Sequence, residues 1–150
     1  MEQAEVRELL KKMNALVETD EGECIDSAAL MEDPIVSNRL AVELLQKLDR
    51  DLKPELVLAP AGVESYFGYS VALSAWMRFG LLEVAGDECA STTVVKKKEK
   101  VVLVLDTLVD DVALKAIRYV EEREGKVVAI LSLLGCPSAA LSGYSCHSLL

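Results

Sequence analysis

Two kinds of hydrophobic pattern alternate along this chain of 150 residues. In one, apolar residues recur every three or four positions among charged ones, which predicts helices with one buried face. In the other, short runs consist mostly of Val, Leu and Ala, which predicts strands buried on both faces. The predicted helices cover residues 4–17, 34–52, 64–79 and 110–124. The predicted strands cover residues 55–59, 81–85, 92–95, 101–105 and 126–133, with a short terminal strand within 143–150.

The order of these segments predicts an α/β fold in a single domain, residues 1–150. Alternating strands and helices are typical of right-handed βαβ units and of a mainly parallel sheet flanked by helices. In such sheets, ligands bind beyond the carboxyl ends of the strands. We therefore expect a binding site where the loops at residues 60–64, 106–110 and 134–142 come together.

The composition narrows the range of partners. Apolar residues make up 51% of the chain and aromatic residues only 5%, so Leu, Val and Ala must form most of the core. The formal net charge of −9 repels nucleic acids and anionic membranes, and we expect neither as a partner. The cysteines form no C-x-x-C pair, so we expect buried, reduced thiols at Cys24, Cys89, Cys136 and Cys146.

The sequence predicts neither export nor membrane insertion. The longest apolar runs, at residues 101–105 and 127–134, are too short to cross a bilayer. The first five residues lack the basic-then-apolar order of a signal peptide. We therefore expect a cytoplasmic protein.

The stretch with the most chemical content is residues 101–111. Asp106 follows a solid apolar strand and precedes a turn into a helix. A carboxylate in that position can hold ribose hydroxyls or magnesium, and Asp110 is near enough in sequence to be a second metal ligand. The alternative is purely structural, because Asp is also favoured in turns and at helix starts. The residues alone leave both interpretations open.

This stretch resembles the phosphoribosyl-pyrophosphate motif of the type I phosphoribosyltransferases. That motif has four apolar residues, two acidic residues, two apolar residues and a Thr/Gly-rich turn into a helix. Residues 102–105 are similar to the apolar four, Asp106 to the first acid and residues 108–109 to the apolar pair. The resemblance places Asp106 and Thr107 at a bound ligand.

Other segments are similar to the orotate-specific branch of that family. They are residues 24–26, the loop at 57–62 with residues 67–69 behind it, and the ending at 144–150. The resemblance implies a small hood built from the N- and C-terminal segments, a pyrophosphate loop containing Ala61 and Gly62, and a homodimer. If the protein is an active transferase, it also implies a magnesium ion and catalytic roles for Asp106 and Lys97.

The turn that should bind the 5-phosphate departs from the family pattern. Asp110 and Asp111 open it, Val-Ala-Leu follows them, and no glycine lies between Asp106 and Gly125. A phosphate nest needs glycines for close backbone approach and a helix start that is free for the anion. We expect Asp110 to cap the helix and to fill the place of the phosphate. Since one pair of like charges about 4 Å apart costs about 4 kcal/mol at an effective dielectric near 20, we expect weak or absent phosphoribosyl-pyrophosphate binding.

A second departure concerns the catalytic loop that orotate enzymes place before the strand at 101–105. Only a short run containing Lys96, Lys97, Lys98 and Lys100 stands there. These lysines resemble a remnant of a loop that clamps pyrophosphate, or else they form a solvent-exposed turn. Glu64 adds a negative charge to the pyrophosphate loop.

Three functions are consistent with these observations. We favour a phosphoribosyltransferase-like protein with weak or no transferase activity, which needs no cofactor and has a nucleotide-related role, binding a nucleotide or small phosphorylated ligand or acting in regulation. The second is an active transferase that uses magnesium and acts on orotate or another base. The third is a structural protein that forms dimers.

Overall fold

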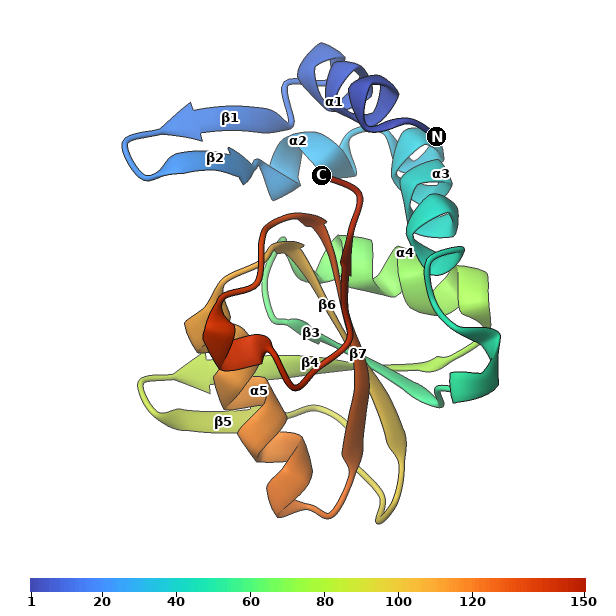
Figure 1. The fold of residues 1–150 in the computed structure, drawn as a ribbon, viewed down its shortest axis with the longest axis vertical. Coiled ribbons are helices and arrows are strands. Elements are labelled where there is room, and N and C mark those ends of the chain that lie inside the picture. Colours follow the sequence, from blue (N-terminus) through green and yellow to red (C-terminus); the bar gives the residue numbers. More distant parts are fainter.

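The computed structural model describes residues 1–150, which form a six-stranded sheet and a separate two-stranded hairpin (Figure 1). The strand order in the large sheet is β5-β4-β3-β6-β7-β8, and only β5 is antiparallel to its neighbour. The predicted α/β fold with a mainly parallel sheet is confirmed. The strands of this sheet are β3 (Leu56–Pro60), β4 (Arg78–Ala85), β5 (Glu88–Ser91), β6 (Lys100–Thr107), β7 (Lys126–Leu134) and β8 (Cys146–Ser148).

Helices cover both faces of the sheet (Figure 1). On one face lie α3 (Pro34–Leu45) and α4 (Ser65–Ala75), and on the other lies α5 (Asp110–Glu122). Alternate residues of β6 belong to the two halves of the core: Val102 packs with α3 and α4, and Leu103 packs with α5. Burial on both faces explains the solid apolar runs of the strands. The longest helix, α5, has 13 residues, and no helix has the length and apolar character needed to cross a bilayer.

The N-terminal segment forms a hood over one end of the sheet, and the C-terminus ends beside it (Figure 1). The predicted helix over residues 4–17 is too long. Asn14 adopts a left-handed φ of 56°, which stops the helix, and Leu16 then pairs with Ile25 in a hairpin. The apolar spacing around Leu16 fits a helix as well as a strand, so periodicity did not separate them. The hood elements are α1 (Gln3–Lys12), β1 (Leu16–Thr19), β2 (Gly22–Ile25) and α2 (Ser27–Met31).

Two further helices are shorter than predicted. The predicted helix at 34–52 is α3 followed by a separate 3₁₀ turn, η1 (Arg50–Leu52). The predicted helix at 64–79 ends at Ala75, because Trp76 takes a left-handed φ of 59° and the chain enters β4 at Arg78. Within α4, a Cβ atom on Gly68 would lie 2.5 Å from the Cβ of Ala59, so glycine lets this helix pack directly on β3.

The predicted edge strand is displaced by four residues. It was expected at residues 92–95, whereas β5 occupies Glu88–Ser91 and follows a tight turn at Gly86, whose φ is +61°. The chain leaves the sheet after Thr92, whose side-chain oxygen accepts a hydrogen bond from the Leu81 amide at 2.9 Å. In the next two residues, Thr93 Oγ1 and the Val94 carbonyl accept hydrogen bonds from Arg78 and not from a neighbouring strand.

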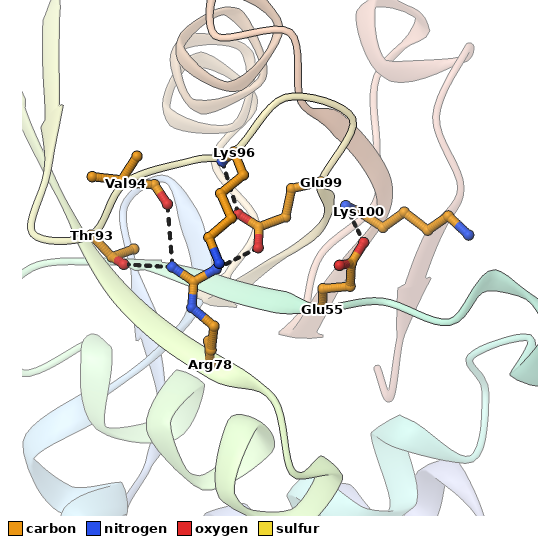
Figure 2. Close-up of polar contacts among 7 residues, drawn as sticks. All are labelled: Glu55, Arg78, Thr93, Val94, Lys96, Glu99 and Lys100. Atoms are coloured by element: carbon orange, nitrogen blue, oxygen red, sulfur yellow. Dashed lines mark hydrogen bonds and ion pairs between the residues drawn. The ribbon is translucent and has the colours of Figure 1, made fainter.

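Arg78 fastens the segment between β5 and β6 to the start of β4 (Figure 2). Its guanidinium pairs with the buried carboxylate of Glu99 and donates to Thr93 Oγ1 at 3.0 Å and to the Val94 carbonyl at 3.2 Å. The other oxygen of Glu99 accepts from the Lys96 amide at 3.0 Å. A buried carboxylate needs such partners, because an unpaired charge in a protein interior is strongly unfavourable.

The cysteines are less buried than predicted. Cys136 is exposed, and Cys24, Cys89 and Cys146 are only partly buried. Burial raises the pKa of the Cys89 and Cys146 thiols. Both thiols are therefore poor nucleophiles near neutral pH.

We expect replacement of Arg78 by Met to lower the free energy of unfolding by about 2 kcal/mol, because Glu99 is then left buried without its charge partner. The value is below the usual cost of breaking a buried pair because Arg78 itself is partly exposed. Urea denaturation measures the change. The control is Lys97→Met, which removes an exposed 3.6 Å pair with Glu124 and should cost less than about 0.5 kcal/mol. Equal losses in the two variants would contradict the role given to Arg78.

Candidate functional site

The carboxyl end of β6 carries a buried acid. Asp106 is only 3% exposed, and one of its carboxylate oxygens, Oδ2, accepts a hydrogen bond from the hydroxyl of Ser27. Its other oxygen, Oδ1, is buried and has no hydrogen-bond partner. Apolar residues of β6 drive the strand into the core, and Asp106 is carried inside with them. One carboxylate oxygen, Oδ1, therefore lies where the protein supplies no hydrogen-bond donor.

The hood is bound to the sheet at this point. The Ile25 amide donates to Thr107 Oγ1 at 2.9 Å, next to the contact between Ser27 and Asp106. The geometry of the hood here follows from its local sequence, because Asp26 caps α2 by accepting from the amides of residues 28 and 29 at 3.1 and 3.2 Å. Two consecutive sheet residues are therefore held by alternate residues of the hood.

A pocket of about 330 Å³ opens between the hood and the sheet. Its acidic residues are Asp26, Glu64 and Asp106, and it contains no Lys, Arg or His. The expected ligand residues Asp106 and Thr107 are both part of it. The remaining lining residues are Ile25, Ser27, Ala28, Val63 and Val109.

The environment of Asp106 disfavours its charged form. Burial raises the pKa of this carboxyl from 3.8 to about 7, the hydrogen bond from Ser27 opposes the rise, and the negative charge of Glu64 adds to it. Asp106 and Glu64 therefore lie close enough to repel each other. Near neutral pH, the net charge of the pocket therefore changes as Asp106 gains or loses its proton.

The other expected loop residues line a neighbouring pocket of about 490 Å³. Ala61 and Gly62 belong to this pocket, together with Glu83 and Val112. Glu64 lines both pockets. Like the first pocket, this one contains carboxylates and no basic side chain.

Asp110 and Asp111 line neither pocket. They are the first two residues of α5, and the prediction that Asp110 caps this helix is wrong, because Val109 occupies the N-cap position without a side-chain hydrogen bond. Asp111 pairs with Lys115 at 3.0 Å. Asp110 lies near Cys146, whose pKa is raised by burial and then by the charge of Asp110. Both acids nevertheless stand at the helix start, where an anion would otherwise bind.

Lys97 lies at the wrong end of the sheet for the catalytic role that was predicted for it. It precedes the start of β6, whereas Asp106 lies near the end of the same strand. At about 3.3 Å per residue, the part of β6 from Lys100 to Asp106 alone separates the two residues by roughly 20 Å. Lys97 is exposed and pairs with Glu124, as expected of a solvent-exposed turn.

The third predicted loop does not reach the pocket. Residues 134–142 contribute none of the lining, and the hood takes the place that we expected them to occupy. Gly135 packs tightly on Leu108, since a Cβ atom on it would lie 2.4 Å from the Leu108 Cβ, and its amide donates to the carbonyl of Leu150 at 3.4 Å. This loop therefore packs against the turn that follows β6.

The predicted metal ligands Asp106 and Asp110 do not share a pocket. Nor does the chain contain a group of three or more Asp, Glu, His or Cys side chains arranged to hold a metal ion. If magnesium binds, a ligand must supply most of its coordination.

Sequence reasoning missed Ser27, the residue that closes the pocket on Asp106. The available sign was local: Asp26 followed by Ser-Ala-Ala-Leu is a favourable helix start. That pattern predicts α2, but it does not say that the helix start lies over a strand about eighty residues later. The contact depends on how the hood packs, which no local pattern specifies.

No protein-family model matches the chain, and no curated protein is similar to it in sequence. Solved structures are similar in fold. Adenine phosphoribosyltransferase from Thermoanaerobacter pseudethanolicus superposes with a TM-score of 0.74 at 20% identity, over 95% of this chain and 97% of that one. Orotate phosphoribosyltransferase from Aeropyrum pernix gives 0.74 at 20% identity, over 96% and 92%.

Adenine phosphoribosyltransferase from Saccharomyces cerevisiae, complexed with an imino-altritol bisphosphate and adenine, gives a TM-score of 0.73 at 16% identity, over 98% of this chain and 99% of that one. These likenesses establish the fold, which is that of the type I phosphoribosyltransferases. They extend to adenine and orotate enzymes alike, so the orotate-like character remains a prediction from the sequence.

We expect the free energy of unfolding to fall between about pH 4 and pH 7 because of Asp106. In this interval the folded protein retains a proton that the unfolded chain has lost, so raising the pH favours unfolding. The loss amounts to about 4 kcal/mol, because each pKa unit corresponds to about 1.4 kcal/mol. Urea denaturation of Asp106→Asn over this interval should lack the slope. The exposed acid Asp111 provides the control, since Asp111→Asn should keep it.

Proposed function

We propose that this protein keeps the phosphoribosyltransferase fold without phosphoribosyl transfer and serves as a binding or regulatory protein. The observation that supports this most is the charge of the two pockets at the carboxyl end of the sheet. Both are lined by carboxylates, and neither contains a Lys, Arg or His side chain. A site that transfers a phosphorylated sugar must instead attract several negative charges.

The electrostatic cost of a sugar phosphate in these pockets is large. Each phosphate charge placed about 4 Å from a carboxylate costs about 4 kcal/mol at an effective dielectric near 20. Glu64 lines both pockets, so its charge opposes a phosphate placed in either of them. At the start of α5, Asp110 and Asp111 oppose the attraction that the helix dipole offers to an anion.

The basic residues do not compensate for these acids. Lys97 and its neighbours precede β6, at the opposite end from the pockets. Lys115, on the helix that follows β6, is paired with Asp111. A nucleotide-related ligand, which the sequence led us to expect, would therefore bind through its base or sugar, with any phosphate directed to solvent.

We expect no heat of binding when magnesium phosphoribosyl pyrophosphate is titrated into the protein in a calorimeter. We also expect no pyrophosphate release when phosphoribosyl pyrophosphate and magnesium are supplied with adenine or with orotate. Steady turnover with either base would show that the protein is an active transferase and would overturn the proposal.

The same titration tests the electrostatic cause. Replacing Asp110 and Asp111 by Asn should raise the affinity for phosphoribosyl pyrophosphate at least about tenfold, from undetectable to weak binding, because the helix start regains its positive character. The control replaces Glu121 and Glu122 by Gln, which changes the net charge equally but roughly 17 Å away along α5. An equal gain in both variants would mean that only net charge matters.

We further propose that the protein forms a homodimer through α3 and α4. Exposed apolar side chains on α4 recur at helical spacing at Tyr69, Leu73 and Trp76, and Ile35 and Val42 extend the surface onto α3. The two helices lie side by side and are joined by a hydrogen bond from Ser74 to Asn38 at 2.8 Å. Such a patch on a surface is typical of a protein–protein contact.

Trp76 is the strongest sign of this contact. Its backbone is left-handed, a conformation that costs a non-glycine residue about 1 kcal/mol, and its side chain is 95% exposed. This conformation ends α4, where the Met77 amide donates to the Ala72 carbonyl at 3.0 Å, but no packing within the chain covers the indole. Burial against a second copy would cover it.

We expect light scattering to give twice the monomer mass of 16.3 kDa for the native protein and the monomer mass for Leu73→Gln combined with Trp76→Asn. Asn tolerates the left-handed backbone, so the variant should fold. The control is Val94→Gln, which removes an apolar side chain that is 74% exposed outside these helices and should leave the mass unchanged. A native protein that is monomeric at all concentrations would contradict the proposal.

A further inference from the structure

The pocket under the hood contains an acceptor that the protein itself does not satisfy. Asp106 lines this pocket and is 97% buried, and no backbone or side-chain donor reaches its Oδ1 atom. Leaving a buried polar atom unpaired costs about 1–3 kcal/mol, and more when the group is charged. A ligand that brings a hydrogen-bond donor would remove this cost.

The second feature is an uncompensated negative charge. Glu64 lines the same pocket, is exposed, and forms no hydrogen bond or ion pair. Asp26 also lines the pocket, but its carboxylate is already used to cap α2. With no basic residue in the lining, the repulsion between Glu64 and an ionised Asp106 is relieved by a cation from outside, or else by protonation of Asp106.

The third feature is the apolar part of the lining. Ile25, Ala28, Val63 and Val109 contribute hydrocarbon side chains to the same pocket. Magnesium keeps several of its water ligands and prefers oxygen donors, so a wall of this kind does not suit a hydrated metal ion. The volume of about 330 Å³ is at the lower end of the range for small-molecule sites.

We propose that this pocket binds a small organic cation, a primary amine whose ammonium group donates to Asp106 Oδ1 and pairs with Glu64. An ammonium group has three donors, so it can serve both carboxylates at once. Its hydrocarbon part lies against Ile25, Val63 and Val109. The inference rests on the proposed function, because a site for phosphoribosyl pyrophosphate would have to attract the opposite charge.

Calorimetric titration at pH 8 and low salt with n-butylamine, which is cationic at that pH, tests the proposal. The comparison ligand is n-butanol, which has nearly the same shape and no charge. We expect the amine to bind at least tenfold more tightly than the alcohol. Magnesium chloride, added to the protein before the amine, should not weaken the binding of the amine.

Two variants test the assignment of the carboxylates. Glu64→Gln should weaken amine binding at least fivefold. Glu83→Gln is the matched control, because Glu83 lines only the neighbouring pocket and its loss should leave the affinity unchanged. Asp106→Asn, which keeps the shape of the side chain, should abolish detectable binding.

Equal binding of butylamine and butanol, equal losses in Glu64→Gln and Glu83→Gln, or competition by magnesium would each overturn the amine site. These outcomes are separate from those that test the absence of transferase activity. Turnover with phosphoribosyl pyrophosphate contradicts the proposed function, whether or not the amine binds. If the protein binds neither phosphoribosyl pyrophosphate nor butylamine, the proposed function stands and only the amine site is contradicted.

Discussion

The contact between the hood and the end of β6 is the constraint on which the functional end of the molecule depends. An acid at the end of a strand that is buried on both faces cannot remain in water, and it is costly to cover. Ser27 satisfies one oxygen of Asp106, and the neighbouring bond from Ile25 to Thr107 holds the hood in register. The covered acid shapes the pocket, sets its charge and leaves one acceptor free.

The fold of this protein does not by itself decide the chemistry of its site. The architecture superposes over nearly its whole length on enzymes that transfer phosphoribosyl groups. The two pockets at the carboxyl end of the sheet are lined by acids and contain no basic side chain, and the proposed absence of transfer rests on this charge. A fold provides positions for functional groups, and the groups at those positions decide the reaction.

The sequence was sufficient for those parts of the structure that depend on local pattern. The apolar run at residues 101–105 predicted β6, and its position before an acid and a helix identified the end of the sheet that carries the pocket. It was insufficient where two structures share one pattern. Leu16 fits a helix and a strand equally well, and the start of β1 was therefore predicted as the end of the first helix.

Contacts between distant segments were also beyond the sequence. The pairing of Arg78 with Glu99 holds the segment after β5 away from the sheet, so the edge strand lies earlier in the chain than predicted. The packing of the hood brings Ser27 to Asp106. Lys97 was assigned a catalytic role, for the case of an active transferase, because its segment resembles a remnant of a catalytic loop, but the direction of β6 puts it at the other end of the sheet. Within one chain, the direction of β6 therefore separates Lys97 from Asp106.

The single tryptophan of the chain has a practical consequence for those who study it. Trp76 is nearly fully exposed, at the end of α4, and lines neither pocket at the carboxyl end of the sheet. Its fluorescence should therefore respond to the proposed association of two copies rather than to a ligand in these pockets. Spectral changes on dilution would follow the meeting of two copies, and occupation of the acidic pocket would pass unseen.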